Sequence, residues 1–345
     1  MLPRERVQAA LDFRPPDVIP VEYHPSPAGI WEHGSALRKL WDTWPNDFGD
    51  PRDFPDRHPE PQFVDANGHY EELRRDEWGV VWRHLIYGIH GHPVERPLDD
   101  WANLGRFETP PVPAANGDAF RLAQARAAEH MSRYYLKSGW ISIFEVMHAV
   151  RRFEDVLMDL AADVPEIHEL ADRITDYQLR TIRYLLERGV DAIQFGDDFG
   201  TASALMISPA VWRRFFKPRY EMLMREVRSA RKAIFFHTCG KGSHILEDLA
   251  ELGVDAIWPH LQVYEPGELA RFCRKHRIAI EIHPDRGDLM TKGEPSQIRA
   301  AVERLADEFC IRSGGGWFYV EIDAGFPLAN VEALIETVGR LRATA

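Results

Sequence analysis

An imidazole and a thiol stand two positions apart, at His237 and Cys239, near the end of the apolar stretch 233–240. Side chains alternate along an extended strand, so both would project to the same side. A borderline-soft cation such as Zn²⁺ accepts imidazole nitrogen and thiolate sulfur together, and Gly240 lets the chain turn away directly afterwards. This spacing indicates two ligands of a metal site. A histidine and a buried thiol packed without a metal fit the same residues equally well.

A metal site with these two ligands needs a third side chain from the end of another strand. Glu321 is the first choice for that ligand, with Glu281, His283 and His260 in reserve. The fourth position would stay open for substrate, as it does in catalytic rather than structural zinc sites.

Carboxylates and imidazoles also follow the other β-rich runs of the chain. Each alone has an ordinary explanation, because the loops after strands are polar and an Asp there often caps the next helix. Their repetition at successive strand ends indicates a polar cavity suited to acid–base chemistry. The candidates are Glu145, Asp197 and Asp198 for catalysis and His24, His260 and His283 for substrate binding.

Short β-rich runs alternate with longer helical patterns from residue 140 onward, which is typical of consecutive βα units and a parallel sheet. The expected strands are 140–144, 192–195, 233–236, 256–258, 278–282 and 317–322, and the expected helices are 164–188, 209–229, 244–252, 266–276, 295–309 and 328–342. Two upstream runs, 18–23 and 80–82, bring the strands to about eight. The pattern therefore predicts an α/β fold, a (β/α)₈ TIM barrel, whose strand ends face one common site.

Residues 1–345 are expected to form a single barrel domain with an N-terminal elaboration. Between residues 25 and 118 the composition shifts to Pro, Trp, His and Asp with little helical periodicity, which predicts a loop-rich extension over one face of the barrel. A structural elaboration and a substrate lid are both open interpretations of this extension.

The composition disfavours several classes of partner. A net charge of −12, with dispersed basic residues, gives no reason to expect nucleic acid or an anionic membrane surface as a partner. Without a signal-peptide core or a membrane-length apolar run, a cytoplasmic protein is expected. Three scattered cysteines do not make a disulfide framework, and Cys273 and Cys310 are expected to be packing residues within helical patterns.

Several segments together resemble the uroporphyrinogen decarboxylase superfamily. They are Arg4-Glu-Arg-Val-Gln-Ala-Ala-Leu11 with Pro16-Asp-Val-Ile-Pro20, Asp76-Glu-Trp-Gly79, the stretch 189–200 followed by Ile207-Ser-Pro209 and Phe216-Lys-Pro-Arg-Tyr220, and Phe236-His-Thr-Cys-Gly240 with 245–257. The resemblance covers most of the chain and implies a (β/α)₈ barrel. Members of this superfamily are cofactor-independent decarboxylases of porphyrinogens or zinc-dependent methyltransferases that use a corrinoid, and related barrels are often homodimers.

Two departures separate the chain from the patterns of these relatives. The N-terminal segment in which true decarboxylases carry substrate-binding arginines reads 21–29 here and has no arginine, which argues against a highly anionic porphyrinogen. The methyltransferases use a His-x-Cys pair and a later cysteine as zinc ligands. His237 and Cys239 match that pair, but the later region, 319–325, has a glutamate and no cysteine.

The leading hypothesis is methyl transfer by a zinc enzyme with His237, Cys239 and Glu321 as ligands. The methyl group would come from a corrinoid on a partner protein or from a methylated small molecule, and a thiol-like acceptor would receive it. A second hypothesis is a cofactor-free decarboxylase in which Asp197 or Asp198 stabilises an electron-deficient intermediate. A third is a non-catalytic barrel that binds a corrinoid protein.

Overall fold

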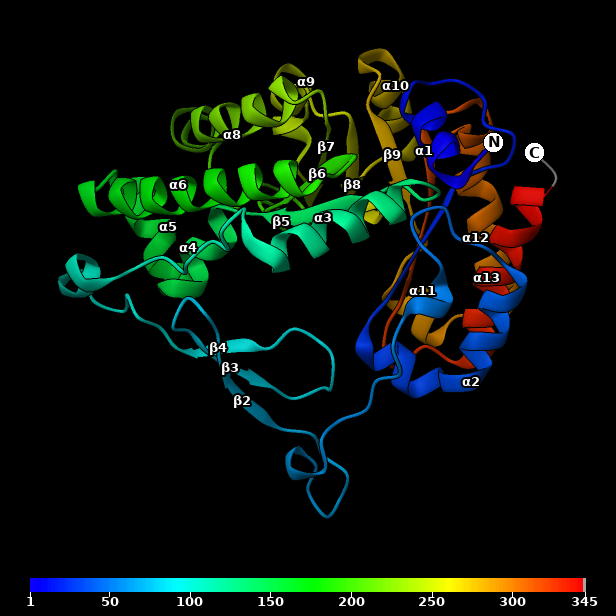
Figure 1. Ribbon diagram of the computed structural model, residues 1–345, viewed down its shortest axis with the longest axis horizontal. Helices are drawn as coiled ribbons and strands as arrows, with labels where there is room; N and C mark the ends of the chain where they lie inside the picture. The colour runs from blue at the N-terminus through cyan, green and yellow to red at the C-terminus, as the bar shows by residue number, and fades with distance from the viewer. Residues whose placement is uncertain (344–345) are drawn as a thin grey trace.

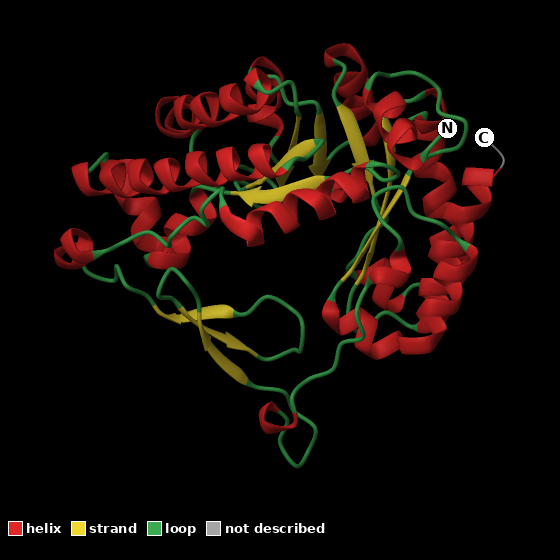
Figure 2. Ribbon diagram, in the orientation of Figure 1, coloured by secondary structure: helices red, strands yellow, loops and turns green. Residues whose placement is uncertain are grey.

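The computed structural model describes residues 1–343, and seven parallel strands make up its main sheet. The strands, in spatial order, are β1 (Val21–Pro25), β10 (Gly316–Ile322), β9 (Ala279–Ile282), β8 (Ala256–Pro259), β7 (Ala233–Thr238), β6 (Ala192–Gly196) and β5 (Lys137–Ile141). The sheet curls, and helices cover its outer face (Figures 1 and 2). The predicted TIM-barrel fold is thereby confirmed. The strand expected at 140–144 lies three residues earlier, because Phe144 already begins a helix.

The helices follow the strands as βα units require. They are α1 (Pro3–Leu11), α2 (Pro27–Thr43), α3 (Gly117–Met131), α4 (Phe144–Val150), α5 (Phe153–Ala162), α6 (Pro165–Arg188), α7 (Pro209–Val211), α8 (Lys217–Ser229), α9 (Leu246–Glu251), α10 (Pro266–His276), α11 (Asp288–Lys292), α12 (Pro295–Glu308) and α13 (Leu328–Ala343). A π-helical turn, η4 (Trp212–Phe216), joins α7 to α8, and 3₁₀ turns occur at η1 (Pro51–Asp53), η2 (Pro61–Phe63), η3 (Trp101–Arg106), η5 (Ser243–Ile245), η6 (Leu261–Val263) and η7 (Ile311–Ser313). None of the helices within residues 1–343 combines the length and hydropathy needed to cross a membrane.

The outer helices form where apolar residues recur at helical spacing. In α6, Ile167, Leu170, Ile174 and Ile182 are all fully buried against the sheet. Buried Cys273 lies in α10 as predicted, but Cys310 is an exposed residue beyond the end of α12. Its left-handed backbone, with φ of 48°, ends the helix there.

The barrel closes at a seam between β1 and β5, where Asp47 stands in for an eighth strand. The Asp47 N–H donates to the carbonyl of Val21 on β1 (2.9 Å), and its carbonyl accepts from the N–H of Tyr135 just before β5 (3.1 Å). The buried Asp47 carboxylate accepts from the Val21 N–H (2.9 Å) and forms ion pairs with Arg6 and Arg342. One irregular residue therefore bridges the two edges.

The short run expected at 80–82 as a barrel strand belongs to a different sheet. It forms β3 (Val81–His84), which pairs antiparallel with β2 (Glu72–Arg75) and β4 (His92–Glu95). A tight turn at Asp76 starts β3: its carboxylate accepts from the N–H of Trp78 and Val80 and from the Trp82 indole. Such a hairpin turn favours antiparallel pairing and not a barrel strand.

The region 25–118 contains more regular structure than the predicted loops. Besides the three-stranded sheet it includes the 17-residue α2, which Gly34 kinks with a φ of 45° and which therefore lacks a clean helical period. In Figure 1 the small sheet stands apart from the barrel strands, below β5 and to the left of β1. The extension lies near the carboxyl ends of the barrel strands.

Candidate metal centre and barrel mouth

Three side chains converge at the carboxyl ends of β6 and β7. Asp198, His237 and Cys239 each offer one ligand atom, and these atoms lie within 4.8 Å of one another. His237 Nε2 is 3.4 Å from Cys239 Sγ and 3.4 Å from Asp198 Oδ1. The structure thus brings together the His-x-Cys pair expected from the sequence, with Asp198 as the third donor.

The imidazole of His237 has a fixed orientation. Its ring is 95% buried, and Nδ1 lies 2.8 Å from the main-chain carbonyl of Trp258 on the neighbouring strand β8. Since a carbonyl can only accept, Nδ1 carries the proton and donates it. Nε2 then presents its lone pair toward Asp198 and Cys239, as it does in histidines whose second nitrogen is held by a protein acceptor.

The loops after β6 and β7 place Asp198 beside Cys239. Main-chain hydrogen bonds join them on either side of Asp198: the Asp197 N–H donates to the His237 carbonyl and the Gly200 N–H donates to the Cys239 carbonyl, both at 3.2 Å. Gly240 has a φ of 72°, and a Cβ there would lie 2.0 Å from the Gly200 carbonyl oxygen. Only glycine allows this close approach of the two loops.

The protonation states at the cluster differ sharply. Burial, reinforced by the negative charge of Asp198, raises the pKa of the Cys239 thiol to about 12. Burial also opposes ionisation of Asp198, but contact with the His237 ring and a hydrogen bond from the Cys239 N–H hold its pKa below the ordinary value. Without a cation the cluster therefore holds a neutral thiol next to a carboxylate.

The two adjacent aspartates have different surroundings. Asp197 is fully buried and accepts hydrogen bonds from the N–H groups of Ile143, Phe144 and Glu145 at the start of α4 and from the hydroxyl of Tyr220. Four donors saturate its oxygens, so no acceptor site is left for a substrate. Asp197 was expected to be catalytic. In the structure it positions α4.

Glu145, the second residue of α4, lies next to the two aspartates. Burial, then the negative charges of Asp197 and Asp198, raise its pKa to about 8. At neutral pH it is mostly protonated and can give up or take up a proton. His148, one turn along α4, was not expected at the site, and burial lowers its pKa to about 4. Only its helical spacing of three from Glu145 could have indicated it.

Glu321 lies on β10 and is absent from the three-residue cluster. It pairs with Arg286 from the loop after β9, and Asp323 lies 3.9 Å from the same guanidinium. Burial raises the pKa of Glu321 to about 7 even beside this cation. The reserve ligand Glu281 is also occupied elsewhere, because it accepts from the Lys137 ammonium.

The three histidines expected to bind substrate have different positions. His283 is 98% buried, and its two ring nitrogens lie 3.1 Å from the main-chain carbonyls of Pro284 and Pro259. It therefore cannot reach a ligand at the mouth. His24 is exposed and stacks on Tyr319 (5.4 Å between ring centroids), and His260 is half-buried.

Aromatic rings that the sequence patterns did not single out surround His237. The indole of Trp258 lies 3.9 Å from the His237 ring and that of Trp140 lies 5.5 Å from it, centroid to centroid. Trp140 lies across Gly196 of β6, where a Cβ would be 2.4 Å from the indole. Although it lies against these rings, Trp140 is 45% exposed, so part of this residue is open to solvent next to His237.

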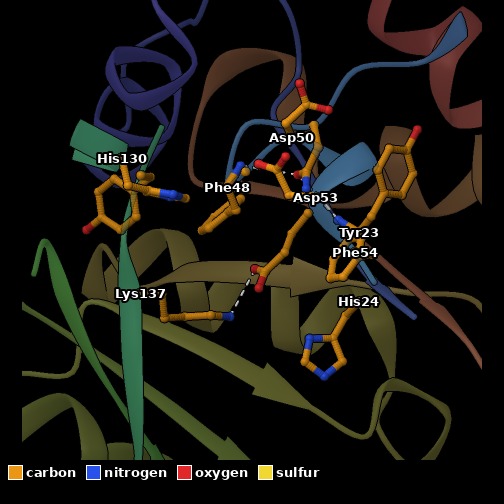
Figure 3. A pocket seen from close by; sticks show the side chains of 12 residues that line it. Tyr23, His24, Phe48, Asp50, Asp53, Phe54, His130 and Lys137 are labelled. Carbon is orange, nitrogen blue, oxygen red and sulfur yellow. Dashed lines mark hydrogen bonds and ion pairs between the residues drawn. The ribbon is translucent and has the colours of Figure 1, made fainter. Parts of the chain in front are cut away.

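A cavity of about 320 Å³ lies at the seam between β1 and β5 (Figure 3). Figure 3 shows His24 and Lys137 on its floor, with Phe48 and Phe54 above them. The dashed line at Lys137 marks its ion pair with Glu22 (2.9 Å), and the same ammonium lies 2.8 Å from Glu281. No motif in the sequence indicated this cavity, because it depends on the irregular segment around Asp47.

Comparisons with known proteins agree with the fold. The chain is 31% identical to a uroporphyrinogen decarboxylase of Thermus thermophilus over 107 residues, which are 31% of this chain and 30% of that protein. It is 32% identical to a uroporphyrinogen decarboxylase of Nocardia farcinica over 147 residues, 43% of this chain and 39% of that protein. The matches therefore span only 30–39% of the length of these curated relatives.

Among solved structures, a methyltransferase from Methanosarcina mazei is similar over 99% of both chains, with a TM-score of 0.64 and 18% sequence identity. This likeness extends to the whole chain and concerns the fold. The sequence model of the uroporphyrinogen decarboxylase (URO-D) family matches residues 93–341. That match includes β5 to β10 and the Asp198, His237 and Cys239 cluster, and the chain belongs to the URO-D family.

Proposed function

We propose that this protein is a zinc-dependent methyltransferase that moves a methyl group from a corrinoid or a methylated small molecule to a thiol-like acceptor. The observation that carries the proposal is the convergence of Asp198, His237 and Cys239 within 4.8 Å. Carboxylate, imidazole and thiolate are all accepted zinc ligands, and three protein ligands are what a catalytic zinc site uses. The donor set therefore fits Zn²⁺.

Asp198 is the preferred third ligand in this proposal, in place of Glu321. Its carboxylate already faces Nε2 of His237, whereas that of Glu321 is neutralised by Arg286. When bound, zinc would lower the pKa of the acceptor and present it as an anion. Cys239 must lose its proton to bind the cation.

The other residues of the mouth would support this chemistry. The Trp258 carbonyl holds the His237 ring in the tautomer that a ligand needs. Glu145 has a pKa close to neutral, which suits it to carry a proton at the edge of the site. A corrinoid, if it is the donor, would arrive on a partner protein and would have to approach the same open side of the barrel.

Metal analysis tests this proposal. Protein purified without chelators should carry about one zinc per chain, and His237→Ala and Cys239→Ala should each lose most of it. Cys310→Ser provides the matched control, because that thiol is exposed and lies outside the cluster. Full metal content in both cluster variants, or none in the wild type even after incubation with zinc, would rule the proposal out.

Decarboxylation without a cofactor is the second candidate. The two curated relatives bear the name uroporphyrinogen decarboxylase, and a protonated Glu145 could deliver the proton that replaces a lost carboxyl group. Activity of this kind would survive treatment with a chelator and would fall on Glu145→Gln. Methyl transfer would instead disappear with the metal.

A further inference from the structure

We infer that the methyl donor of this site is a methylated onium compound, a quaternary ammonium or a tertiary sulfonium, which binds on the exposed indole of Trp140. This inference rests on the proposed methyl transfer for its chemistry, although binding of an onium does not need the metal. It follows from the charge of the barrel interior and from the position of one aromatic ring.

The charges in the barrel do not suit an anionic ligand. Lys137 is shared between Glu22 and Glu281, at 2.9 and 2.8 Å. A cation already paired with two carboxylates has little attraction left for a third anion, because the carboxylates offset its charge.

Arg286 is in the same situation on the opposite wall. It is shared between Glu321 and Asp323 and also lies over the ring of Trp258, with 5.6 Å from its guanidinium carbon to the centroid. Asp198 adds a carboxylate on the wall of β6 and β7, and Glu145, which is mostly protonated at neutral pH, adds no positive charge. The mouth is therefore suited to ligands that are positive or neutral.

Trp140 provides the surface that a methylated cation requires. Indole attracts cations through its negative face, and methylated ammonium ions are bound in this way because they cannot make strong hydrogen bonds. The ring is 45% exposed at a position where His237 lies 5.5 Å away and Trp258 lies 6.4 Å away. Gly196 makes room for it, and the Asp198 side chain, 36% exposed, supplies a negative charge 3.4 Å from Nε2 of the same His237.

This position would bring an electrophilic methyl carbon close to the candidate metal centre. The thiolate of the acceptor attacks the methyl carbon, and a carbon–sulfur bond forms. The bond from carbon to the onium nitrogen or sulfur breaks, and its electron pair stays on the leaving atom, which departs as a neutral amine or thioether. No oxidant, reductant or further proton is needed for this step.

Binding of choline and of its uncharged isostere 3,3-dimethylbutan-1-ol tests the inference, since the two differ in charge and hardly in shape. Calorimetric titration of the full chain should show choline binding about tenfold more tightly. Trp140→Leu should abolish this preference and Trp140→Phe should keep part of it. Trp31→Leu is the matched control, because Trp31 is another exposed tryptophan, on α2 (53% against 45% for Trp140), and its replacement should leave the preference unchanged.

Equal binding of choline and its isostere by the wild type, or an unchanged preference in Trp140→Leu, would overturn the inference. Zinc content measured on the same samples separates it from the proposed function: a choline preference in protein that binds no zinc would leave the inference standing and the methyltransferase proposal refuted. Transfer assays with tetramethylammonium and with trimethylsulfonium then distinguish the two kinds of donor. A thermal melt of Trp140→Leu that matches the wild type establishes that the variant is folded.

Discussion

The two walls of the barrel mouth carry carboxylates in opposite circumstances. On the wall of β6 and β7, Asp198 meets an imidazole, a thiol and a main-chain N–H, and its pKa is lowered. On the wall of β9 and β10, Glu321 meets a guanidinium, yet burial raises its pKa to about 7. Asp198 lies beside an imidazole nitrogen and a thiol sulfur, and this group of donors suits a metal cation. Glu321 is already paired with a cation, the Arg286 guanidinium.

The sharpest test of this contrast compares the two carboxylates as zinc ligands. Asp198→Asn should weaken zinc binding by about a hundredfold or more, since it removes a charged ligand. Glu321→Gln should change it by less than about threefold. Competition with a chromophoric chelator gives both affinities, and the reverse order of effects would show that Glu321 moves to the metal on binding.

The pH dependence of zinc binding tests the state of the thiol. Because the pKa of Cys239 is about 12 without metal, each zinc must displace one proton over the neutral range. The affinity should therefore rise about tenfold per pH unit between pH 6 and 8. Proton release into a weakly buffered dye solution should be close to one per zinc, and a flat profile would mean that the thiol is already ionised.

The two walls should also respond oppositely to pH in their stability. The folded protein holds the Glu321 proton more tightly than the unfolded chain does, so Glu321 lowers stability as pH rises from 4.5 to about 7. Relative to the wild type, Glu321→Gln should then gain about 1–3 kcal/mol in unfolding free energy between pH 4.5 and 8.

Asp198 has the opposite sign in the metal-free protein. Its lowered pKa contributes stability above the ordinary value of 3.8 that disappears as pH falls. Asp198→Asn should therefore lose stability relative to the wild type as pH rises. Denaturant titrations at several pH values measure both trends, and parallel trends in the two variants would contradict the contrast.

The smallest effect is expected at a cysteine away from both walls. Cys310 is exposed beyond α12, so Cys310→Ser should leave zinc affinity unchanged and alter the unfolding free energy by less than about 0.5 kcal/mol. Thermal melts and zinc titration check this. A larger change would mean that replacing a cysteine outside the cluster also perturbs the protein, so the effect of Cys239→Ala could not be assigned to the cluster alone.

The sequence was informative where a local pattern sets the geometry. His237 and Cys239 could be paired because residues two apart on a strand share a face, and the alternation of strands and helices predicted the barrel. The roles of Asp197 and Asp198 could not be separated, because both follow β6 and only the turn decides which one points to α4 and which to His237. Glu321 was preferred as the third metal ligand because no sequence pattern shows that Arg286, from the loop after β9, pairs with it in the folded protein.

The sequence predicted that the barrel closes, but not which residues join its first and last strands. A strand at 80–82 has the right composition, but the turn at Asp76 commits it to a hairpin. Asp47 lies in an irregular segment rich in Pro, Asn and Gly, and nothing in its neighbours signals a strand. Its role depends on Arg6 and Arg342, which are far from it in the chain.

The Asp47 carboxylate at the seam pairs with Arg6 of the first helix and with Arg342 of the last. The two helices therefore stabilise together the part of the barrel that contains the Lys137–Glu22 ion pair. Deleting either α1 or the final turn of α13 would remove one of the two ion pairs of Asp47. Either truncation would then admit water to the interior far from the deleted segment. It would disturb the buried Lys137 ammonium before it disturbed the termini.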